Sequence, residues 1–349
     1  MDERLRVVLA GRDPDVVEQT NRFVESSAQA RVVGETGCAA DVVELAASSD
    51  AELVFLDMDF DAPSGTTILK ALRDRLPETT VIVMSALSSA RATMEALSLG
   101  ALEYVCTEPG KLQSTPLAPQ IERAVHNAWV VNRKPTAKRK SKAAPASDLP
   151  ESLRRSYDMV LIGISTGGPA ALEVVVEQLA GADLPPVLIV QHMGRFFTAQ
   201  LAETLTRAAG RPVKEGREGM MLEPGSIVVA PGGMHCEIGM VAPQEDFHRL
   251  RIRDSAPVNG CRPSVDVTWR SFARFFGGDV LSILMTGMGE DGAEGLAVLK
   301  GKGAVCVAQD EASSVVWGMP GAAVAAGTPH EVLSLEQIAE LLATGVERK

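Results

Sequence analysis

The 349 residues are too many for one ordinary domain, so we expect two domains. Hydrophobic residues make up 46% of the chain and charged residues 23%, which is typical of a globular protein and excludes a disordered one. The net charge of −11 argues against a general nucleic-acid binder, which needs a basic surface to neutralise phosphates.

Neither membrane insertion nor export is expected. No segment approaches the ~20 apolar residues that span a bilayer, and the N-terminal MDERLRVVLAG lacks the apolar core of a signal peptide. The five cysteines are scattered, without a Cys-x-x-Cys pair, and indicate reduced thiols and not disulfides or metal ligands. These features predict a cytoplasmic protein.

The first third of the chain alternates short apolar runs with helical patterns such as the amphipathic residues 14–27. Continuous apolar strands between helices predict a parallel sheet that is covered on both faces, with functional groups beyond the carboxyl ends of its strands. Those ends carry Asp57, Asp59, Ser85 and the pair Thr107–Glu108. The strand candidates are residues 6–10, 31–35, 52–59, 79–86 and 102–106.

A linker is expected after a last helix at residues 117–132. The segment NRKPTAKRKSKAAPAS is rich in Lys, Arg, Ala, Pro and Ser and has no apolar periodicity. Its basic run is interpreted as a solvated tether in preference to a nucleic-acid site. The predicted organisation is a first domain at 1–128, a basic flexible linker at 129–155 and a second domain at 156–349.

A second α/β pattern follows the linker. Apolar strands end in glycine-rich turns that lead into helices, and a helical C-terminus is expected from Leu335. A mostly parallel sheet is again the economical fold. The strand candidates lie in MVLIGIS, PPVLIVQHM, GSIVVAPGG, DVLSILM and AVCVAQD.

Ser165 is the candidate nucleophile. It stands in the Gly-x-Ser-x-Gly turn GISTG, in which glycines let the chain bend sharply and leave the serine hydroxyl free at the sheet edge. Backbone N–H groups at the start of the next helix could stabilise an oxyanion. The alternative is a phosphate-binding loop, although no Lys follows the glycines and Ser165 replaces the middle glycine of a dinucleotide motif.

His192 is the best placed base, because it follows the next strand in the predicted order and could meet Ser165 at one sheet edge. His235, after another strand turn, is the second candidate. The remaining three histidines fall on a helix or polar loops and are expected at the surface: His126, His248 and His330.

Asp291 is the candidate acid that orients the base. It lies in the glycine-rich turn TGMGEDG after the strand SILM, where Met288 or a neighbour can offer another backbone N–H. On spacing alone, an acid in such a turn could equally well cap the following helix. Asp266, in a helical-looking stretch, is a further candidate.

Six sequence motifs, taken together and in order, resemble those of a known family. Residues 157–342 resemble the catalytic domain of chemotaxis protein-glutamate methylesterases of the CheB type, and the N-terminal part resembles a response-regulator receiver. The resemblance implies a flavodoxin-like receiver followed by a doubly wound, mostly parallel α/β methylesterase domain. It rests on six motifs in order, namely IGISTGG, QHM, APGGMH, RPSVDV, LMTGMGEDGAEGL and AQDEASSVVWGMP.

The resemblance also implies the chemistry. Ser165 would be the nucleophile, His192 the general base and Asp291 the orienting acid, with backbone amides near Met288 holding the oxyanion and Thr166 beside the nucleophile. The reaction would be hydrolysis of glutamate γ-methyl esters on methyl-accepting receptor helices, with deamidation of glutamines by the same acyl-enzyme route. No cofactor or metal would be needed.

The receiver departs from its family's pattern. Asp57 is present as a phosphoacceptor candidate and Ser85 fits the expected hydroxyl, but Gly11 and Arg12 stand where two acids belong and Glu108 replaces the usual lysine. Fewer oxygens would then hold Mg²⁺, and Glu108 would repel a phosphate. Asp13 could reach the site if the first strand runs longer, and Arg12 could neutralise Asp57 directly.

We therefore expect a receiver that acts by docking or protein contact in preference to ordinary Mg²⁺-dependent phosphorylation, with phosphorylation by a chemotaxis histidine kinase as the alternative. Two other functions compete with the esterase. One is a non-catalytic two-domain signalling module, which is disfavoured because the three catalytic positions are intact. The other is a nucleotide-binding oxidoreductase, which is disfavoured by the missing glycine.

Overall fold

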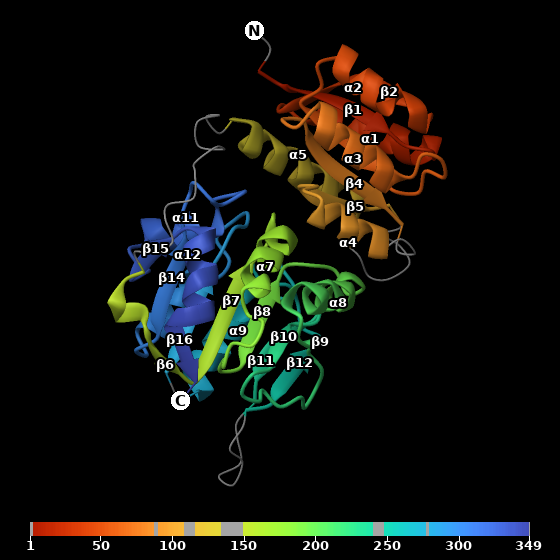
Figure 1. The fold of residues 1–349 in the computed structure, drawn as a ribbon. Coiled ribbons are helices and arrows are strands. Elements are labelled where there is room, and N and C mark those ends of the chain that lie inside the picture. The colour runs from red at the N-terminus through yellow and green to blue at the C-terminus, as the bar shows by residue number, and fades with distance from the viewer. Residues whose placement is uncertain are drawn as a thin grey trace. The chain divides into compact units, whose positions relative to one another are not determined.

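The computed structural model describes residues 3–86, 90–107, 116–133, 149–239, 248–276 and 279–348. The chain forms two compact units, Met1–Pro135 and Thr136–Lys349, and each is treated by itself (Figure 1). Glu108, which stands where the receiver pattern has a lysine, lies outside the described residues.

The first unit is built on a five-stranded parallel sheet in the order β2-β1-β3-β4-β5. The middle strands are almost wholly buried, as their continuous apolar sequences predict for a sheet covered on both faces. The strands are β1 (Leu5–Ala10), β2 (Ala30–Thr36), β3 (Leu53–Asp57), β4 (Thr80–Ser85) and β5 (Glu103–Cys106), and the helices are α1 (Pro14–Ser26), α2 (Val42–Ser48), α3 (Gly65–Arg75), α4 (Ala90–Ser98) and α5 (Leu117–Arg133).

Helix α5 runs past the boundary predicted at residue 128. Val131 is buried, and the side-chain amide of Asn132 donates to the Thr80 hydroxyl at 2.9 Å. The last turn therefore still packs on the sheet of the first unit, and the part of the predicted linker up to Arg133 is helix.

The second unit contains a seven-stranded parallel sheet in the order β15-β14-β13-β7-β8-β10-β9. The chain adds β8 on one side of β7 and later β13 on the other, so the winding direction changes at β7. Ligand sites of open α/β sheets lie beyond the carboxyl ends of strands at such a point. The strands are β7 (Met159–Ile164), β8 (Val187–Gln191), β9 (Val213–Glu215), β10 (Ile227–Val229), β13 (Val280–Leu284), β14 (Val305–Gln309) and β15 (Glu331–Leu333).

Helices cover both faces of this sheet, as a doubly wound fold requires. Helix α7 packs against α8 and α12, while α9 packs against α10. In the view of Figure 1, α7 and α12 lie in front of the strands and α9 lies behind them. The helices are α7 (Gly168–Glu177), α8 (Phe197–Ala209), α9 (Val265–Phe275), α10 (Ala293–Lys300), α11 (Met319–Ala325) and α12 (Leu335–Glu340).

Two small sheets were not predicted. Strands β11 (His235–Ile238) and β12 (Leu250–Arg253) form an antiparallel pair beside α9, and β6 (Arg155–Tyr157) pairs with β16 (Val346–Arg348). The expectation of a helical C-terminus is thus wrong for its last residues, which form a strand beside β6. In the part of the chain that the structure describes, no helix combines the length and the apolar character needed to cross a bilayer.

Candidate active site

Ser165 directly follows β7, at the strand where the sheet changes its winding direction. It is half-buried, and its backbone N–H donates to the carbonyl of Thr286 at 2.9 Å. The bend that follows it needs glycine, because Gly167 has φ +77° and a Cβ there would lie 2.6 Å from Val315. The Gly-x-Ser-x-Gly turn therefore has the strand-to-helix geometry that its sequence predicts.

His192 lies at the end of the neighbouring strand. Strands β7 and β8 pair in parallel with Ile164 opposite Gln191, and the N–H of His192 donates to the carbonyl of Ile164 at 3.1 Å. Ser165 is thus the first residue after β7, and His192 is the first residue after β8. The two side chains arise side by side at one sheet edge, as the sequence predicts.

The imidazole of His192 is bound to a carboxylate. Its Nε2 lies 2.7 Å from Oδ2 of Asp291, and the two side chains are only 11% and 2% exposed. Burial by itself lowers the pKa of His192, but the hydrogen bond to Asp291 and the contact with the Cys261 sulfur outweigh it and raise that pKa from 6.5 to about 9.

Asp291 is held in place by the N-terminus of α9. Its carboxylate accepts hydrogen bonds from the hydroxyl of Ser264 at 2.7 Å and from the N–H of Val265 at 2.6 Å. Burial raises the pKa of Asp291, but the bonds from His192, Ser264 and Val265 outweigh it and leave that pKa below its usual value. The acid is therefore ionised and fixed in orientation.

Asp266 has the complementary position. Its Oδ1 accepts from the N–H groups of Gly292 and Gly295 at 3.0 and 2.6 Å, so this side chain, and not Asp291, caps the start of α10. Burial raises the pKa of Asp266. The capping alternative for Asp291 is thus wrong for the helix that follows it, and Asp266 does not contact the base. Asp291, from the turn before α10, thus accepts an N–H at the start of α9, and Asp266, from the first turn of α9, accepts N–H groups at the start of α10.

Cys261 occupies the other side of the histidine ring. Its Sγ lies 3.5 Å from Nδ1 of His192, the nitrogen that Asp291 does not bind. Among the described residues, His192, Cys261 and Asp291 are also the one group whose donor atoms are close enough to share a metal ion. Cys261 and Asp291 meet opposite nitrogens of the ring, so the arrangement suits a base held from two sides better than one ion bound by all three.

Asn259 joins the two acids. Its side-chain amide lies 3.2 Å from Oδ2 of Asp266 and 3.4 Å from Oδ1 of Asp291. Asn259 has φ +52° and is followed by Gly260 at φ +71°, in a tight turn closed by mutual backbone hydrogen bonds between Val258 and Cys261. One short turn thus brings both Asn259 and Cys261 to the site.

The predicted oxyanion residues lie at the same edge. The N–H of Met288 has no hydrogen-bond partner in the part of the chain that the structure describes, and the carbonyl of Thr166 accepts from the Thr286 hydroxyl at 2.9 Å. A Cβ on Gly287 would lie 2.7 Å from the Cβ of Ser165, so only glycine allows this close approach of the second turn.

His235 is not available as a base. It is buried, its Nε2 contacts the carbonyl of Ala256 at 2.9 Å, and its Nδ1 accepts from the N–H of Ser264. His126 and His248 are half-buried and not surface residues as expected, since they pack on Trp129 and Phe276 respectively. His330 is exposed, as expected, and accepts the N–H of Cys306 at 3.0 Å.

In the first unit, Asp57 lies at the end of β3. Its carboxylate accepts from the backbone N–H groups of Arg12 and Asp59 at 3.0 and 2.8 Å. The guanidinium of Arg12 pairs with Asp61 at 3.0 Å, so the expectation that it neutralises Asp57 is wrong. Ser85 is fully buried, and its hydroxyl oxygen accepts a hydrogen bond from the hydroxyl of Thr93 at 2.8 Å.

Asp13, the acid that a longer first strand would bring to Asp57, lies at the start of a helix. Asp13 is the N-cap of α1, where its side chain accepts from the N–H groups of Asp15 and Val16. Strand β1 ends at Ala10, so the longer strand that would carry Asp13 to the site does not form. With Asp13 used as a cap and the cation of Arg12 at the site's edge, the described residues fit a Mg²⁺ ion poorly.

Sequence reasoning missed three residues of the site: Asn259, Cys261 and Ser264. Two signals could have found them. Asn-Gly marks a tight turn, and Ser264 before an amphipathic run marks a helix start. Neither signal says that the turn folds over a distant histidine.

Comparison with known proteins gives the same division of the chain. Residues 160–342 match the family model described as CheB methylesterase, and residues 7–110 match the model described as response regulator receiver domain. A solved structure, the CheB methylesterase catalytic domain of Thermotoga maritima, is similar at 33% identity with a TM-score of 0.50, over 53% of this chain and 97% of that one.

Curated relatives extend over nearly the whole chain. A protein-glutamate methylesterase/protein-glutamine glutaminase of Archaeoglobus fulgidus is 34% identical over 98% of both chains. A protein of the same name from Desulfotalea psychrophila is 35% identical over 84% of this chain and 85% of its own. The relatives therefore share both units, and not the second alone.

Proposed function

The chain belongs to the CheB methylesterase family, and we propose that its second unit hydrolyses glutamate γ-methyl esters of proteins through Ser165, His192 and Asp291. The observation that carries this assignment is the 2.7 Å contact between His192 and a buried Asp291, beside a strand that ends in Ser165. The three side chains are those that nucleophilic acyl transfer needs at one place.

The first step follows from the geometry of the ring. Asp291 holds Nε2, so we assign the proton of the Ser165 hydroxyl to Nδ1, the nitrogen that otherwise has only the Cys261 sulfur at 3.5 Å beside it, as the serine oxygen attacks the ester carbonyl. The Asp291 carboxylate stabilises the imidazolium that forms. The proton then passes from Nδ1 to the leaving methoxide, and methanol departs from a glutamyl ester of Ser165.

The negative oxygen of the intermediate needs donors. The N–H of Met288, without a partner among the described residues, and the turn after Thr166 lie at this sheet edge, and we assign the oxyanion to them. Water then attacks the acyl-enzyme with His192 again as base, and the glutamate carboxylate is released. The reaction so written uses no metal or cofactor.

A glutamine side chain can enter the same route. Attack of Ser165 on its amide gives the same acyl-enzyme, with ammonia in place of methanol as the leaving group. The curated relatives carry both activities in their names, which supports deamidation as a second reaction of this chain.

We assign the substrate to methyl-accepting receptor helices and the protein to the cytoplasm, and we propose that the first unit acts through protein contact. This proposal is supported by the poor fit of the described residues around Asp57 to a Mg²⁺ ion, because Asp13 caps α1 and Arg12 pairs with Asp61. Phosphorylation of Asp57 by a chemotaxis histidine kinase is the competing mode of control, and it is supported by the receiver family match.

The test is release of methanol from methylated receptor by the full chain. Wild type should release methanol, and Ser165→Ala should not, whereas the exposed Ser152→Ala should behave as wild type. If wild type releases none, the alternative of a non-catalytic signalling module replaces the esterase.

A further inference from the structure

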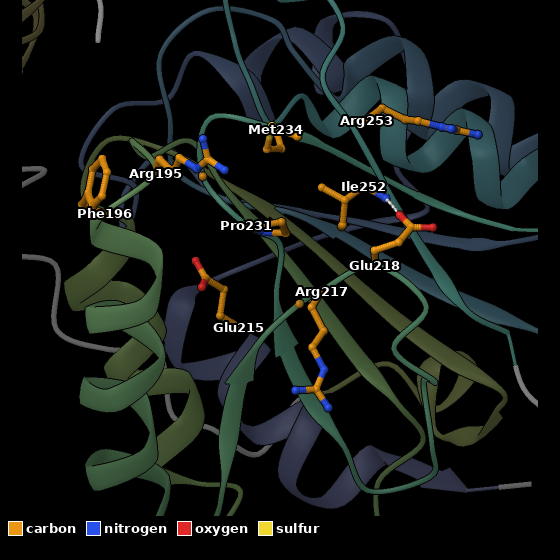
Figure 2. Close-up of a pocket in the computed structure, with 11 residues that line it drawn as sticks. Arg195, Phe196, Glu215, Arg217, Glu218, Pro231, Met234, Ile252 and Arg253 are labelled. Carbon is orange, nitrogen blue, oxygen red and sulfur yellow. Dashed lines mark hydrogen bonds between the residues drawn. The ribbon is translucent and has the colours of Figure 1, made fainter. Parts of the chain in front are cut away.

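A hollow lies at the same edge of the sheet as Ser165, beyond the carboxyl ends of β8, β10 and β9. It has a volume of about 620 Å³ and is open to solvent. Figure 2 shows Arg195 and Phe196 on one side of it, Pro231 in the middle, and Ile252 and Glu218 on the other side. We call this the rim pocket, and it is lined by Arg195, Phe196, Glu215, Gly216, Arg217, Glu218, Pro231, Gly232, Met234, Ile252 and Arg253.

The rim pocket is joined to the catalytic loop. Arg195 stands three residues after His192 in the loop that leaves β8. A Cβ on Gly232 would lie 2.5 Å from the carbonyl oxygen of Gly194, so the loop after β10 packs directly on the segment between His192 and Arg195. A molecule bound in the pocket would therefore touch the segment that carries the base.

Two cations in the pocket are unpaired. Arg195 and Arg217 are exposed, and neither guanidinium group has a hydrogen bond or ion pair within the ranges that the structure describes. Arg253, by contrast, lies 3.7 Å from Glu237. Exposed guanidinium groups without partners are suited to bind a carboxylate, which matches their planar donors.

The carboxylates of the pocket already have donors. Glu215 accepts from the hydroxyl of Thr198 at 2.5 Å, and Glu218 accepts from the N–H of Ile252 at 2.6 Å. With three arginines and two glutamates, the rim pocket carries a net positive charge on a chain whose overall charge is −11. Exposed Phe196 and half-buried Ile252 add apolar surface to the rim.

The spacing of the strands gives the approximate distance between the rim pocket and Ser165. Ser165 follows β7, while the pocket is lined by the segments after β8, β10 and β9, which are the next strands in order, and by Ile252 and Arg253 of β12. Strands lie about 4.8 Å apart, so the pocket centre near β10 is about 10 Å from Ser165. Along a helix, which rises 1.5 Å per residue, this is about seven residues, or two turns of the same face.

We propose that the rim pocket binds an acidic side chain of the substrate helix, two turns from the esterified glutamate, with Arg195 and Arg217 as the cations that receive its carboxylate. The proposal rests on the methylesterase function and names a determinant of which glutamates are hydrolysed. Since these arginines would contact the substrate away from the reacting bond, they would lower KM and leave kcat unchanged.

The test uses the full chain and two helical peptides with one glutamate γ-methyl ester each. They differ only two turns away, where one has glutamate and the other glutamine. Wild type should prefer the glutamate peptide by about fivefold in kcat/KM through KM, and added salt should weaken the preference. Arg195→Ala with Arg217→Ala should abolish it, while Arg207→Ala, an exposed arginine of α8 outside the pocket, should not.

Charge reversal separates binding from a folding defect. The variant with Arg195→Glu and Arg217→Glu should prefer a third peptide that has lysine at the same position. Equal preference in wild type and the alanine variant would overturn the role of the pocket, as would an equal loss of activity on both peptides. If wild type hydrolyses neither peptide although both are helical, the esterase function fails first and the pocket's role fails with it.

Discussion

The imidazole of His192 is held at both nitrogens, by the Asp291 carboxylate at Nε2 and by the Cys261 sulfur at Nδ1. Both contacts favour the protonated ring, and together they raise its pKa to about 9 against the effect of burial. Because the base acts in its neutral form, activity should increase as pH rises through this pKa. We therefore expect the acid limb of the pH profile to lie above the ordinary pKa of histidine.

Asp291→Asn should lower kcat by about 10⁴-fold, because the ring loses both its orientation and the charge that stabilises the imidazolium. It should also move the acid limb of the kcat/KM profile to lower pH, since the carboxylate is what raises the pKa of His192. The profile of methanol release against pH measures both effects. An acid limb at the same pH in the variant would contradict the role of Asp291.

Cys261→Ala should shift the acid limb to lower pH without removing activity. The sulfur at 3.5 Å from Nδ1 helps to raise the pKa of His192, so its loss leaves more neutral base at pH 7 and increases kcat/KM there. Cys38→Ala, at an exposed cysteine of the first unit, is the control. If the variant is less active than wild type at every pH, the thiol does more than raise the pKa of His192.

At the scale of elements, the site rests on the exchange of acids between α9 and α10. Asp291 receives the N–H of Val265 at the start of α9, and Asp266 receives those of Gly292 and Gly295 at the start of α10. A Cβ on Gly163 of β7 would lie 2.6 Å from Val265, so α9 also packs tightly on the strand that ends in Ser165. The two helix starts, the nucleophile strand and the acid therefore form one packed unit.

Asp266→Ala should destabilise the second unit, because it leaves buried N–H groups of α10 without acceptors. An unmade hydrogen bond of this kind costs about 1–3 kcal/mol, and in a unit of this size each kcal/mol lowers Tm by about 2–4 °C. Thermal unfolding measures the change. Glu294→Ala, at an exposed acid in the same first turn, should stay close to wild type. Equal Tm values for the two variants would refute the capping role.

The elements that position the site were predictable because they are continuous apolar strands. Ser165 and His192 directly follow β7 and β8, Asp291 lies in the turn that follows β13, and parallel pairing brings these strand ends together. The short strands β9 and β15, the β11–β12 pair and the C-terminal strand β16 were not predicted. Three or four residues carry too little periodicity, and β16 has a single buried apolar residue, Val346.

At the scale of the whole molecule, the two units differ in which of their family's functional side chains they retain. The second unit brings Ser165, His192 and Asp291 to one sheet edge, whereas the first lacks acids at Gly11 and Arg12 and uses Asp13 as a helix cap. The order of the two domains was predictable from motifs and composition. The use of Asp13 was not, because one acid before a proline fits both a metal site and a helix start.

Acetyl phosphate with Mg²⁺ should not label Asp57 rapidly in the full chain. The expectation follows from the poor fit of the described residues to the ion that ordinary receivers use for this reaction. Intact mass measurement over time checks it, with Asp57→Ala as the reference. Fast Mg²⁺-dependent labelling of wild type that is absent from this variant would restore phosphorylation as the mode of control.

The most direct test of the central claim is the reaction of the full chain with a fluorophosphonate, followed by mass spectrometry of its peptides. The oxygen of an activated serine displaces fluoride and becomes phosphonylated. One label per chain should appear on Ser165, and His192→Ala and Asp291→Asn should slow its appearance strongly. A label on another residue, or equal rates in all three proteins, would contradict a nucleophile at Ser165 activated by His192 and Asp291.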